Sequence, residues 1–554
     1  MMSSFMTRCQ WILPCVALLV FAVGCGDPAP RVDRSASAQI GGESGTELAA
    51  RQVLHRGNGA EPQSLDPHKS EGVPESNLQR DIFEGLTNDS PEEGIVPGAA
   101  SSWEISNDGL VYIFQMREDG RWSNGDPVTA HDFVYGLRRS VDPATLSNYS
   151  IMLRPIVNAE QIIAGELPPD SLGVRALDDM TLEIRLNGPT PYFLGVLTHS
   201  ASYPVHRASI EQYGDRWARP GRLVSNGAYR LRDWVMQSHI VLERNEHYWD
   251  NDNTTLDEVW YYPIENQSTE LQRYRAHALD MTYDLPFRQL GWIRQNLPDE
   301  LMISEYLGIY YFGLNVTREP FKDNVKLRRA LYLAVDREIL TRQVTTAGEI
   351  PAYGWVPNAA NYEQYTPEWA EWTQEERVAE ARRLYAEAGY SVDQPLRVQI
   401  LYNTHENHRT ISVAISSMWN EALGIETELV NEEWKVFLET RRTKQSTQVF
   451  RAGWIGDYND AFTFAEMMHS DSGLNDSGWS NARYDELLAL ASREGNMERR
   501  AGYLREAERV LIHDVPLIPV YFYVTKRLVK PWVGNYRPHI QDIIYSKDLK
   551  ILKH

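Results

Sequence analysis

The sequence predicts a mixed α/β protein of more than one domain, in which at least one lobe contains a parallel sheet. The chain has 554 residues, which is longer than one domain usually reaches. Residues 396–401 have the pattern of a buried strand, residues 408–423 that of a helix closed by Gly424, and residues 425–430 that of another strand. A strand, a helix and a strand of these lengths form a βαβ unit, which joins parallel strands.

Other segments predict further helices and strands around this unit. Residues 373–388 are typical of a helix, because Thr373 and Glu376 form a capping box and Gly389 supplies a stop. Asp323, before the sequence VKLRRALYLAVDREIL, predicts another helix start. Strands are predicted at residues 111–115, 181–186 and 240–242.

The first residues predict export. A short segment with one positive charge precedes the apolar run at residues 11–23, and small residues then precede Cys25. This is the pattern of a secretory signal peptide over residues 1–24, and it is too short for a comfortable membrane span. The ending is similar to a bacterial lipobox, which predicts that Cys25 is lipidated and that residues 25–49 form a flexible tether. The alternative is a plain signal peptide followed by a chance cysteine.

The composition excludes several classes of protein. Of the three cysteines, Cys9 and Cys15 leave with the signal, so the mature chain retains only Cys25 and has no disulfide of its own. The formal net charge of −21 argues against nucleic acid as a partner. The 16 Trp and 29 Tyr residues can line a ligand cleft, although most such residues are ordinary core.

Catalytic and metal-binding motifs are few. The sequence contains no P-loop, no GxGxxG and no GxSxG motif. His405 and His408 lie three residues apart, whereas a zincin needs a spacing of four with a glutamate directly after the first histidine. A polar helix N-terminus is the better interpretation of this segment. We therefore expect a protein that is not an enzyme and needs no metal or cofactor.

Several blocks of sequence in one order resemble a known family. EPQSLDPHKSEGVPESNLQRDIFEGL (61–86) and WSNGDPVTAHDFVYGLRR (122–139) resemble oligopeptide-binding proteins of peptide ABC importers, in solute-binding family 5. NGAYRLRDWV, IVLERNEHYWDN, RAGWIGDYND and YFYVTKRLVKPWVGNY extend the resemblance over almost the whole chain after the tether. It implies a two-lobed periplasmic-binding-protein-like fold (type II, cluster C), with an extra third domain and the ligand in the cleft between the lobes.

The resemblance also implies where the domains lie. The expected hinge crossings lie near Tyr306 and Val524, and hinge closure around a ligand is the expected motion. Lobe I would combine residues 50–83, 207–307 and 524–554, the extra domain would span 84–206, and lobe II would span 308–523.

The implied ligands are short peptides of about two to five residues, bound largely independently of their sequence. The resemblance places Asp457 at the position that binds the peptide ammonium, although an Asp between Gly and Tyr-Asn is by itself typical of a turn. It implies Arg451, His408 and Arg441 as candidates for the peptide carboxylate. Where relatives often have a lysine this chain has Thr345, and Arg342, one helical turn earlier, is a fourth candidate.

Two segments are expected to pair with the peptide backbone, and aromatic residues to line the side-chain pockets. The backbone segments are Glu71, Gly72 and Val73, and Ala452, Gly453, Trp454 and Ile455; the pocket walls are Tyr149, Tyr283, Tyr306, Tyr311, Trp434 and Trp454.

The resemblance implies a monomeric, lipid-anchored protein on the periplasmic or extracytoplasmic face of a bacterial membrane. Its expected partners are short peptides and the permease subunits of an ABC importer with their ATPases. One alternative is a sibling specificity: dipeptide, murein tripeptide, nickel or haem. An exported peptidase, or a surface adhesin or chaperone, would belong to a different class.

Overall fold

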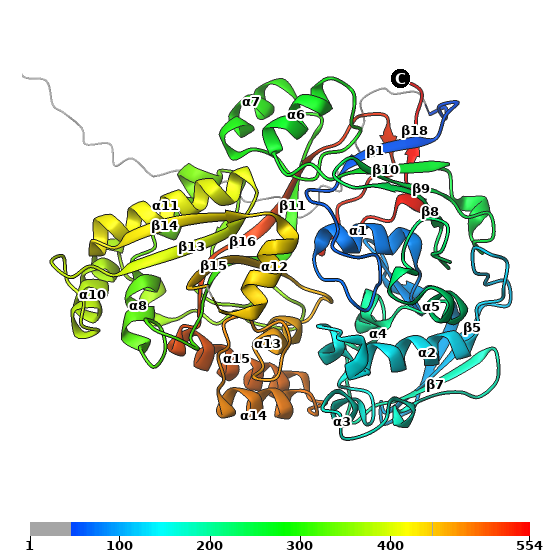
Figure 1. Ribbon diagram of the computed structural model, residues 1–554, viewed down its shortest axis with the longest axis horizontal. Helices are drawn as coiled ribbons and strands as arrows, with labels where there is room; N and C mark the ends of the chain where they lie inside the picture. Colours follow the sequence, from blue (N-terminus) through cyan, green and yellow to red (C-terminus); the bar gives the residue numbers. More distant parts are fainter. Residues whose placement is uncertain (1–45, 446) are drawn as a thin grey trace, which may run out of the picture. The chain divides into compact units, whose positions relative to one another are not determined.

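The structure, a computed structural model, describes residues 46–445 and 447–554 (Figure 1). The predicted signal peptide, Cys25 and all of the predicted tether except residues 46–49 lie outside these residues. Within the described part, no helix is both long and apolar enough to cross a membrane. The described strands form three sheets of four or more strands and two sheets of two strands.

The largest sheet has six strands in the order β12-β16-β11-β15-β13-β14 (Figure 1). β13 (Arg397–Asn403) pairs in parallel with β14 (Glu426–Glu432), and α11 (Glu406–Leu423) connects them. The predicted βαβ unit is therefore confirmed. Gly424 ends its helix in the left-handed conformation, at φ 72°. β13 also pairs in parallel with β15 (Val449–Ile455), at two residues only.

Two long antiparallel strands form the middle of this sheet. β11 (Leu301–Leu314) pairs with β16 (Leu517–Leu528) along almost its full length. The register shifts between Glu305 and Ile309, where the regular pairing is interrupted. This interruption lies beside Tyr306, at one of the two expected hinge crossings.

The capping box of α10 (Gln374–Glu387) is present as predicted. The Glu376 amide donates to Thr373 Oγ1 at 3.2 Å, and the Thr373 amide donates to Glu376 Oε2 at 2.8 Å. Gly389, the predicted stop, has a φ of 93°. The exchange of hydrogen bonds satisfies two amides that the first turn of a helix leaves free.

The helix predicted after Asp323 is present, but its start and its end differ from the prediction. α8 (Val325–Leu333) is capped by Asn324, whose side chain accepts from Leu327, so the choice of Asp323 was wrong by one residue. The helix also ends at Leu333 instead of continuing through residue 340. Asp336 caps a separate turn, α9 (Arg337–Ile339), and a π-helical turn follows at Leu340–Thr345.

The other two sheets contain the remaining predicted strands. The strands predicted at 111–115, 181–186 and 240–242 are confirmed as β5, β7 and β9. One sheet has the order β1-β10-β9-β8, and the other, on which α2 (Ala130–Val141) packs, has the order β4-β5-β7-β6. The bounds are β1 Val53–Gly57, β10 Glu258–Tyr262, β9 His239–Arg244, β8 Tyr229–Val235, β4 Ala100–Ile105, β5 Val111–Met116, β7 Thr181–Arg185 and β6 Val174–Ala176.

The remaining α-helices and strands connect these sheets (Figure 1). They are α1 Val73–Ile82, β2 Thr87–Ser90, β3 Gly94–Pro97, α3 Ala159–Ile163, α4 Phe193–Val196, α5 Arg207–Tyr213, α6 Gln267–Arg275, α7 Leu290–Asn296, β12 Ile350–Pro351, α12 Trp434–Thr443, α13 Phe462–Met467, α14 Ala482–Ala491, α15 Met497–Asp514, β17 Val533–Gly534 and β18 Lys550–Ile551.

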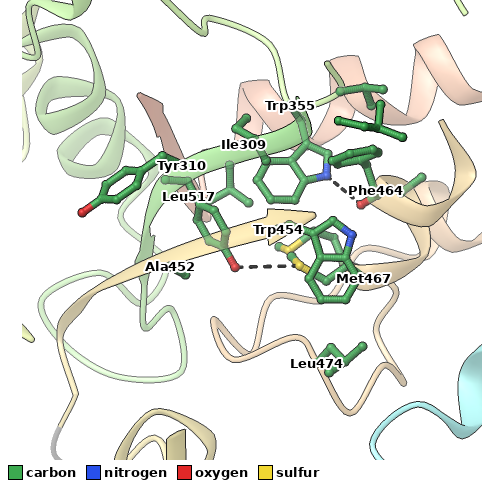
Figure 2. Close-up of a cluster of buried hydrophobic side chains, with 14 of the residues drawn as sticks. Ile309, Tyr310, Trp355, Ala452, Trp454, Phe464, Met467, Leu474 and Leu517 are labelled. Carbon is green, nitrogen blue, oxygen red and sulfur yellow. Dashed lines mark hydrogen bonds between the residues drawn. The ribbon is translucent and has the colours of Figure 1, made fainter. Parts of the chain in front are cut away.

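One face of β15 is anchored in the hydrophobic core. Figure 2 shows Ala452 and Trp454 among the buried side chains that surround Trp355 and Met467. The Trp355 indole donates to the Phe464 carbonyl at 2.6 Å, which ties this layer to α13. Because side chains alternate along a strand, burying Ala452 and Trp454 turns Arg451, Gly453 and Ile455 to the opposite face.

Candidate functional site

Two adjoining pockets form one continuous candidate site. They contain about 1180 and 1020 Å³ of empty space, which includes the part of the cleft that is open to solvent. We call them the first pocket, which contains Asp457, and the second pocket, which contains His408. Both are lined by Gly72, Val73, Tyr306, Trp434, Arg451, Gly453, Ile455 and Asp542.

The edge of β15 supplies one wall of both pockets. On one side β15 pairs with β11 from Val449 to Ile455. On the other side, β13 pairs with β15 only at Val449 and Phe450. Residues 451–455 therefore have no strand partner on that side among the described residues. Three of these residues line both pockets and Trp454 lines the first, whereas Ala452 lines neither and is buried in the core. An open strand edge of this kind can pair with an extended chain.

The segment from Glu71 to Val73 also contributes to both pockets and leads into α1. Gly72 is the residue before the helix and has a φ of 110°, which favours glycine. A Cβ on Gly72 would lie 2.9 Å from Trp434 Cζ2. Glu71 accepts from Arg442 of α12 at 2.5 Å, so an ion pair joins this segment to the wall that carries Trp434.

Asp457 lies in the first pocket, two residues after β15, where its carboxylate is buried. Its backbone amide donates to Thr463 Oγ1, and the Thr463 hydroxyl donates back to its Oδ2, both at 3.1 Å. Burial raises the pKa of Asp457 to about 7, and the hydroxyl of Thr463 only partly offsets this. A cation that enters the pocket would stabilise the ionised form of this carboxylate.

His199 lies beside Asp457, although sequence reasoning did not identify it. Its Nε2 is 3.4 Å from Asp457 Oδ1, and its Nδ1 accepts from the Ala201 amide at 3.2 Å. Burial lowers the pKa of His199 to about 3, so the ring is neutral at pH 7. With Nδ1 accepting, the proton of the neutral ring lies on Nε2 and faces the carboxylate. Asp457 therefore faces a neutral N–H group here, and it has no charged ion-pair partner among the described residues.

Arg451 is a half-buried cation whose partners are all neutral. It donates to Asn403 Oδ1 at 3.2 Å and to the Tyr523 hydroxyl at 3.0 Å, and its guanidinium lies 5.0 Å from the centre of the Tyr310 ring. Among the described residues no Asp or Glu forms an ion pair with it. The guanidinium is therefore available to an incoming carboxylate.

The other three candidates for a carboxylate lie in different surroundings. Arg441 lines the first pocket but already forms an ion pair with Asp476. His408 lines the second pocket and stacks on His405, with ring centres 4.1 Å apart. Arg342 lines neither pocket: it is exposed, in a separate surface hollow that also contains Asp336 and Glu338.

Thr345, at the position where the family resemblance implies a lysine, is buried and donates to Glu349 at 2.6 Å. A lysine nevertheless lines the second pocket, because Lys526 of β16 lies 3.4 Å from Asp284 and 3.5 Å from Glu349. Nothing in the pattern around Lys526 distinguished it from an ordinary strand residue. Among the described residues, no three His, Cys, Asp or Glu side chains are grouped so that they could hold a metal ion.

The aromatic residues predicted as pocket walls line the candidate site, and some of them also contact buried residues of the core. The Tyr311 hydroxyl lies 3.8 Å from Met467 Sδ, and the Trp454 indole donates to the Thr463 carbonyl at 3.1 Å. Such contacts hold the aromatic rings in fixed positions at the surface of the cavity. All six line one pocket or both: Tyr149, Tyr283, Tyr306, Tyr311, Trp434 and Trp454.

Known proteins resemble this chain along nearly its whole length. The family model "Bacterial extracellular solute-binding proteins, family 5 Middle" matches residues 94–476. The chain is 44% identical over 516 residues to the periplasmic oligopeptide-binding protein OppA of Salmonella typhimurium, which covers 92% of this chain and 94% of that protein.

Solved structures give the same result. The murein tripeptide binding protein MppA of Escherichia coli matches with a TM-score of 0.90 and 39% identity, covering 92% of this chain and 100% of that one. OppA of Haemophilus influenzae in complex with the peptide RPPGFSPFR matches with a TM-score of 0.89 and 40% identity, at the same coverage.

These comparisons confirm the predicted two-lobed type II fold with mixed helices and strands. The proteins matched are binding proteins and not enzymes, as the sequence predicts. The chain belongs to family 5 of the bacterial extracellular solute-binding proteins.

Proposed function

We propose that this protein captures short peptides outside the cytoplasm and delivers them to an ABC importer. The observation that carries the proposal is the pair of charges in one cleft. Within the described ranges, Asp457 lacks a charged counter-ion and Arg451 lacks an acidic partner, and an open strand edge lies between them. A free peptide offers an ammonium, a carboxylate and an extended backbone, which match these three features.

The ammonium is bound by Asp457. On binding, the buried carboxylate gains a charge-assisted hydrogen bond, which is stronger than a bond between neutral groups. Removing one member of such a buried pair costs about 3–5 kcal/mol, because the other charge stays unpaired. The Thr463 hydroxyl and the neutral His199 ring hold the carboxylate in place before the peptide arrives.

The carboxylate is bound by different groups according to peptide length, in the range of two to five residues. Arg451 lines both pockets and suits a tripeptide, whereas His408 lies in the second pocket and suits a longer chain. Glu71 to Val73 and the edge of β15 pair with the backbone, which makes binding largely independent of sequence. Water in the two pockets adapts to different side chains.

Closure of two lobes about the crossings at Tyr306 and Val524 completes the cycle. We assign lobe I to residues 50–83, 207–307 and 524–554, the extra domain to 84–206 and lobe II to 308–523. The register shift in β11 beside Tyr306 supports a hinge at this point. The closed form then docks on permease subunits, whose ATPases drive release.

The protein is held at the membrane surface by a lipid on Cys25, after removal of residues 1–24 as a signal peptide. The support for this is the apolar run and the small residues before Cys25. A tether rich in Gly, Ser, Ala and Pro would then separate the folded chain from the membrane.

Calorimetric titration tests the peptide function. Ligand is removed by unfolding and refolding, and trialanine and a murein tripeptide are then titrated in separate experiments. Micromolar or tighter binding of trialanine supports a general peptide site, and the peptide must be recovered intact. Binding of the murein tripeptide alone would replace the general site with a specific one, and binding of neither would contradict the proposal.

A further inference from the structure

The first pocket contains one more positive charge than a simple peptide can neutralise. Three of its charged side chains are already paired: Glu71 with Arg442, Arg441 with Asp476, and Asp542 with Arg527. The charges that remain without an ion-pair partner among the described residues are one carboxylate, Asp457, and two guanidinium groups, Arg80 and Arg451.

Helix α1 carries Arg80 to the Asp457 end of the cleft. Val73, Ser76 and Arg80 lie on one face of the helix and all line the first pocket. Seven helical residues span about 10 Å, so Arg80 lies roughly three extended peptide residues from the backbone-pairing segment at Val73. The positive charge of Arg80 influences the pKa of both Asp457 and His199, which agrees with this position.

The guanidinium of Arg80 makes no hydrogen bond and no ion pair within the part of the chain that the structure describes. Its side chain is half-buried and open to the pocket. Closing the cleft over a peptide removes water from the pocket, and a cation that loses its water without gaining an anion is costly.

A peptide with one ammonium and one carboxylate neutralises Asp457 and Arg451 and leaves Arg80 unmatched. We propose that Arg80 binds a second carboxylate, carried by the side chain of the first or second residue of the peptide. The cleft then favours peptides with Asp or Glu near the amino terminus. This inference rests on the proposed function, and it names the ligand class that neutralises the charges of the cleft.

Matched pairs of tripeptides test the inference by calorimetry. Glu-Ala-Ala is compared with Gln-Ala-Ala, and Ala-Glu-Ala with Ala-Gln-Ala, so that each pair differs in charge but hardly in shape. For the wild-type protein we expect the Glu peptide of at least one pair to bind about tenfold or more tightly. The pair that shows the difference identifies which residue carries the carboxylate.

Three variants separate the role of Arg80 from other effects. In Arg80→Met the Glu/Gln ratio should fall to about one, and in Arg80→Lys it should stay well above one because the charge remains. Arg288→Met changes an exposed arginine outside both pockets and should keep the wild-type ratio. Thermal unfolding checks that each variant is folded, and the wild-type comparison stands even if one is not.

Trialanine separates failure of this inference from failure of the peptide function. If trialanine binds and the wild-type Glu/Gln ratio is near one in both pairs, the role of Arg80 is overturned and the peptide function stands. A wild-type preference for Glu that survives Arg80→Met overturns it as well. If no peptide binds, both proposals fail.

Discussion

Asp457 shows how one buried group can be set up for a ligand. Thr463 gives its carboxylate a hydrogen bond, the neutral ring of His199 lies 3.4 Å away, and burial raises the pKa of Asp457 to about 7. The free protein therefore holds a carboxylate that ionises reluctantly, and a bound ammonium would relieve this cost. The neutral state of His199 is essential, because a charged imidazole would compete with the ligand.

This state of Asp457 predicts that peptide affinity depends on pH. An ammonium favours the ionised carboxylate, so the pKa of Asp457 is lower in the complex than the value of about 7 in the free protein. The complex then holds fewer protons, and affinity should fall by up to about tenfold per pH unit below pH 7. Above pH 8 the peptide amine itself loses its proton, and affinity should fall again.

Titrations of trialanine from pH 5 to pH 9 check this profile. Asp457→Asn is the control: its affinity should be weak and nearly flat between pH 5 and pH 7. Burial raises the pKa of Glu466 to about 8, and this residue lies close enough to influence Asp457. The pH dependence of affinity is therefore assigned to Asp457 only if Asp457→Asn abolishes it. A flat wild-type profile would contradict it.

Arg451 predicts how a tripeptide carboxylate is bound. Arg451→Met keeps much of the side-chain volume but removes the charge, and should weaken trialanine binding by about 1.5–3 kcal/mol, the range for hydrogen bonds to charged groups. Trialanine amide, which lacks the carboxylate, should bind the wild type and the variant with similar affinity. Calorimetry on the two proteins with the two peptides measures the coupling between Arg451 and the peptide carboxylate. If the two changes reduce affinity additively, Arg451 does not bind the carboxylate.

At the scale of elements, β15 and α1 hold the two walls of the cleft. β15 buries one face in the core and leaves the edge at residues 451–455 open. On the other wall, Gly72 allows the chain to turn into α1 while it passes close to Trp434. The open edge of β15 and the turn at Gly72 both bring the protein backbone to the surface of the cleft.

Gly72→Ala should therefore weaken peptide binding about tenfold or more. The new Cβ would lie 2.9 Å from Trp434 Cζ2, and a φ of 110° costs about 1–3 kcal/mol for a residue with a side chain. Gly94→Ala is the matched control, because Gly94 has a positive φ and no atom within 4 Å of its added Cβ. Calorimetry should show a loss in the first variant only, and equal losses would contradict the role of Gly72.

Elements governed by neighbouring residues could be predicted from the sequence. The capping box at Thr373, the stop at Gly424 and the βαβ unit all depend on side chains a few positions apart. The break after Leu333 could not be predicted. It is stabilised by Arg337, which is fully buried and donates to the carbonyls of Ala352 and Pro519, far along the chain.

At the scale of the whole molecule, the candidate site is made of contacts between distant segments. His199 meets Asp457, Glu71 meets Arg442, and Lys526 meets Asp284, each pair far apart in the sequence. Local patterns carry no signal for such pairs. The resemblance to a family indicated Asp457 and Arg451, and the fold was needed to add His199, Arg80 and Lys526.

Two of these contacts join segments that we assign to different domains. Arg442 of lobe II meets Glu71 of lobe I, and Asp457 of lobe II meets His199 of the extra domain. A peptide bound between them would touch every part of the protein at once. Under the proposed function, a few charged contacts at the cleft would then control closure of the lobes.

The central claim is that Asp457 binds a free amino terminus. The most direct test is a double-mutant cycle by calorimetry on refolded protein, with wild type and Asp457→Asn, and with trialanine and N-acetyl-trialanine. The account predicts tight binding only for wild type with the free peptide, and a coupling of about 3–5 kcal/mol between carboxylate and ammonium. Equal affinity of wild type for the free and acetylated peptides would contradict it.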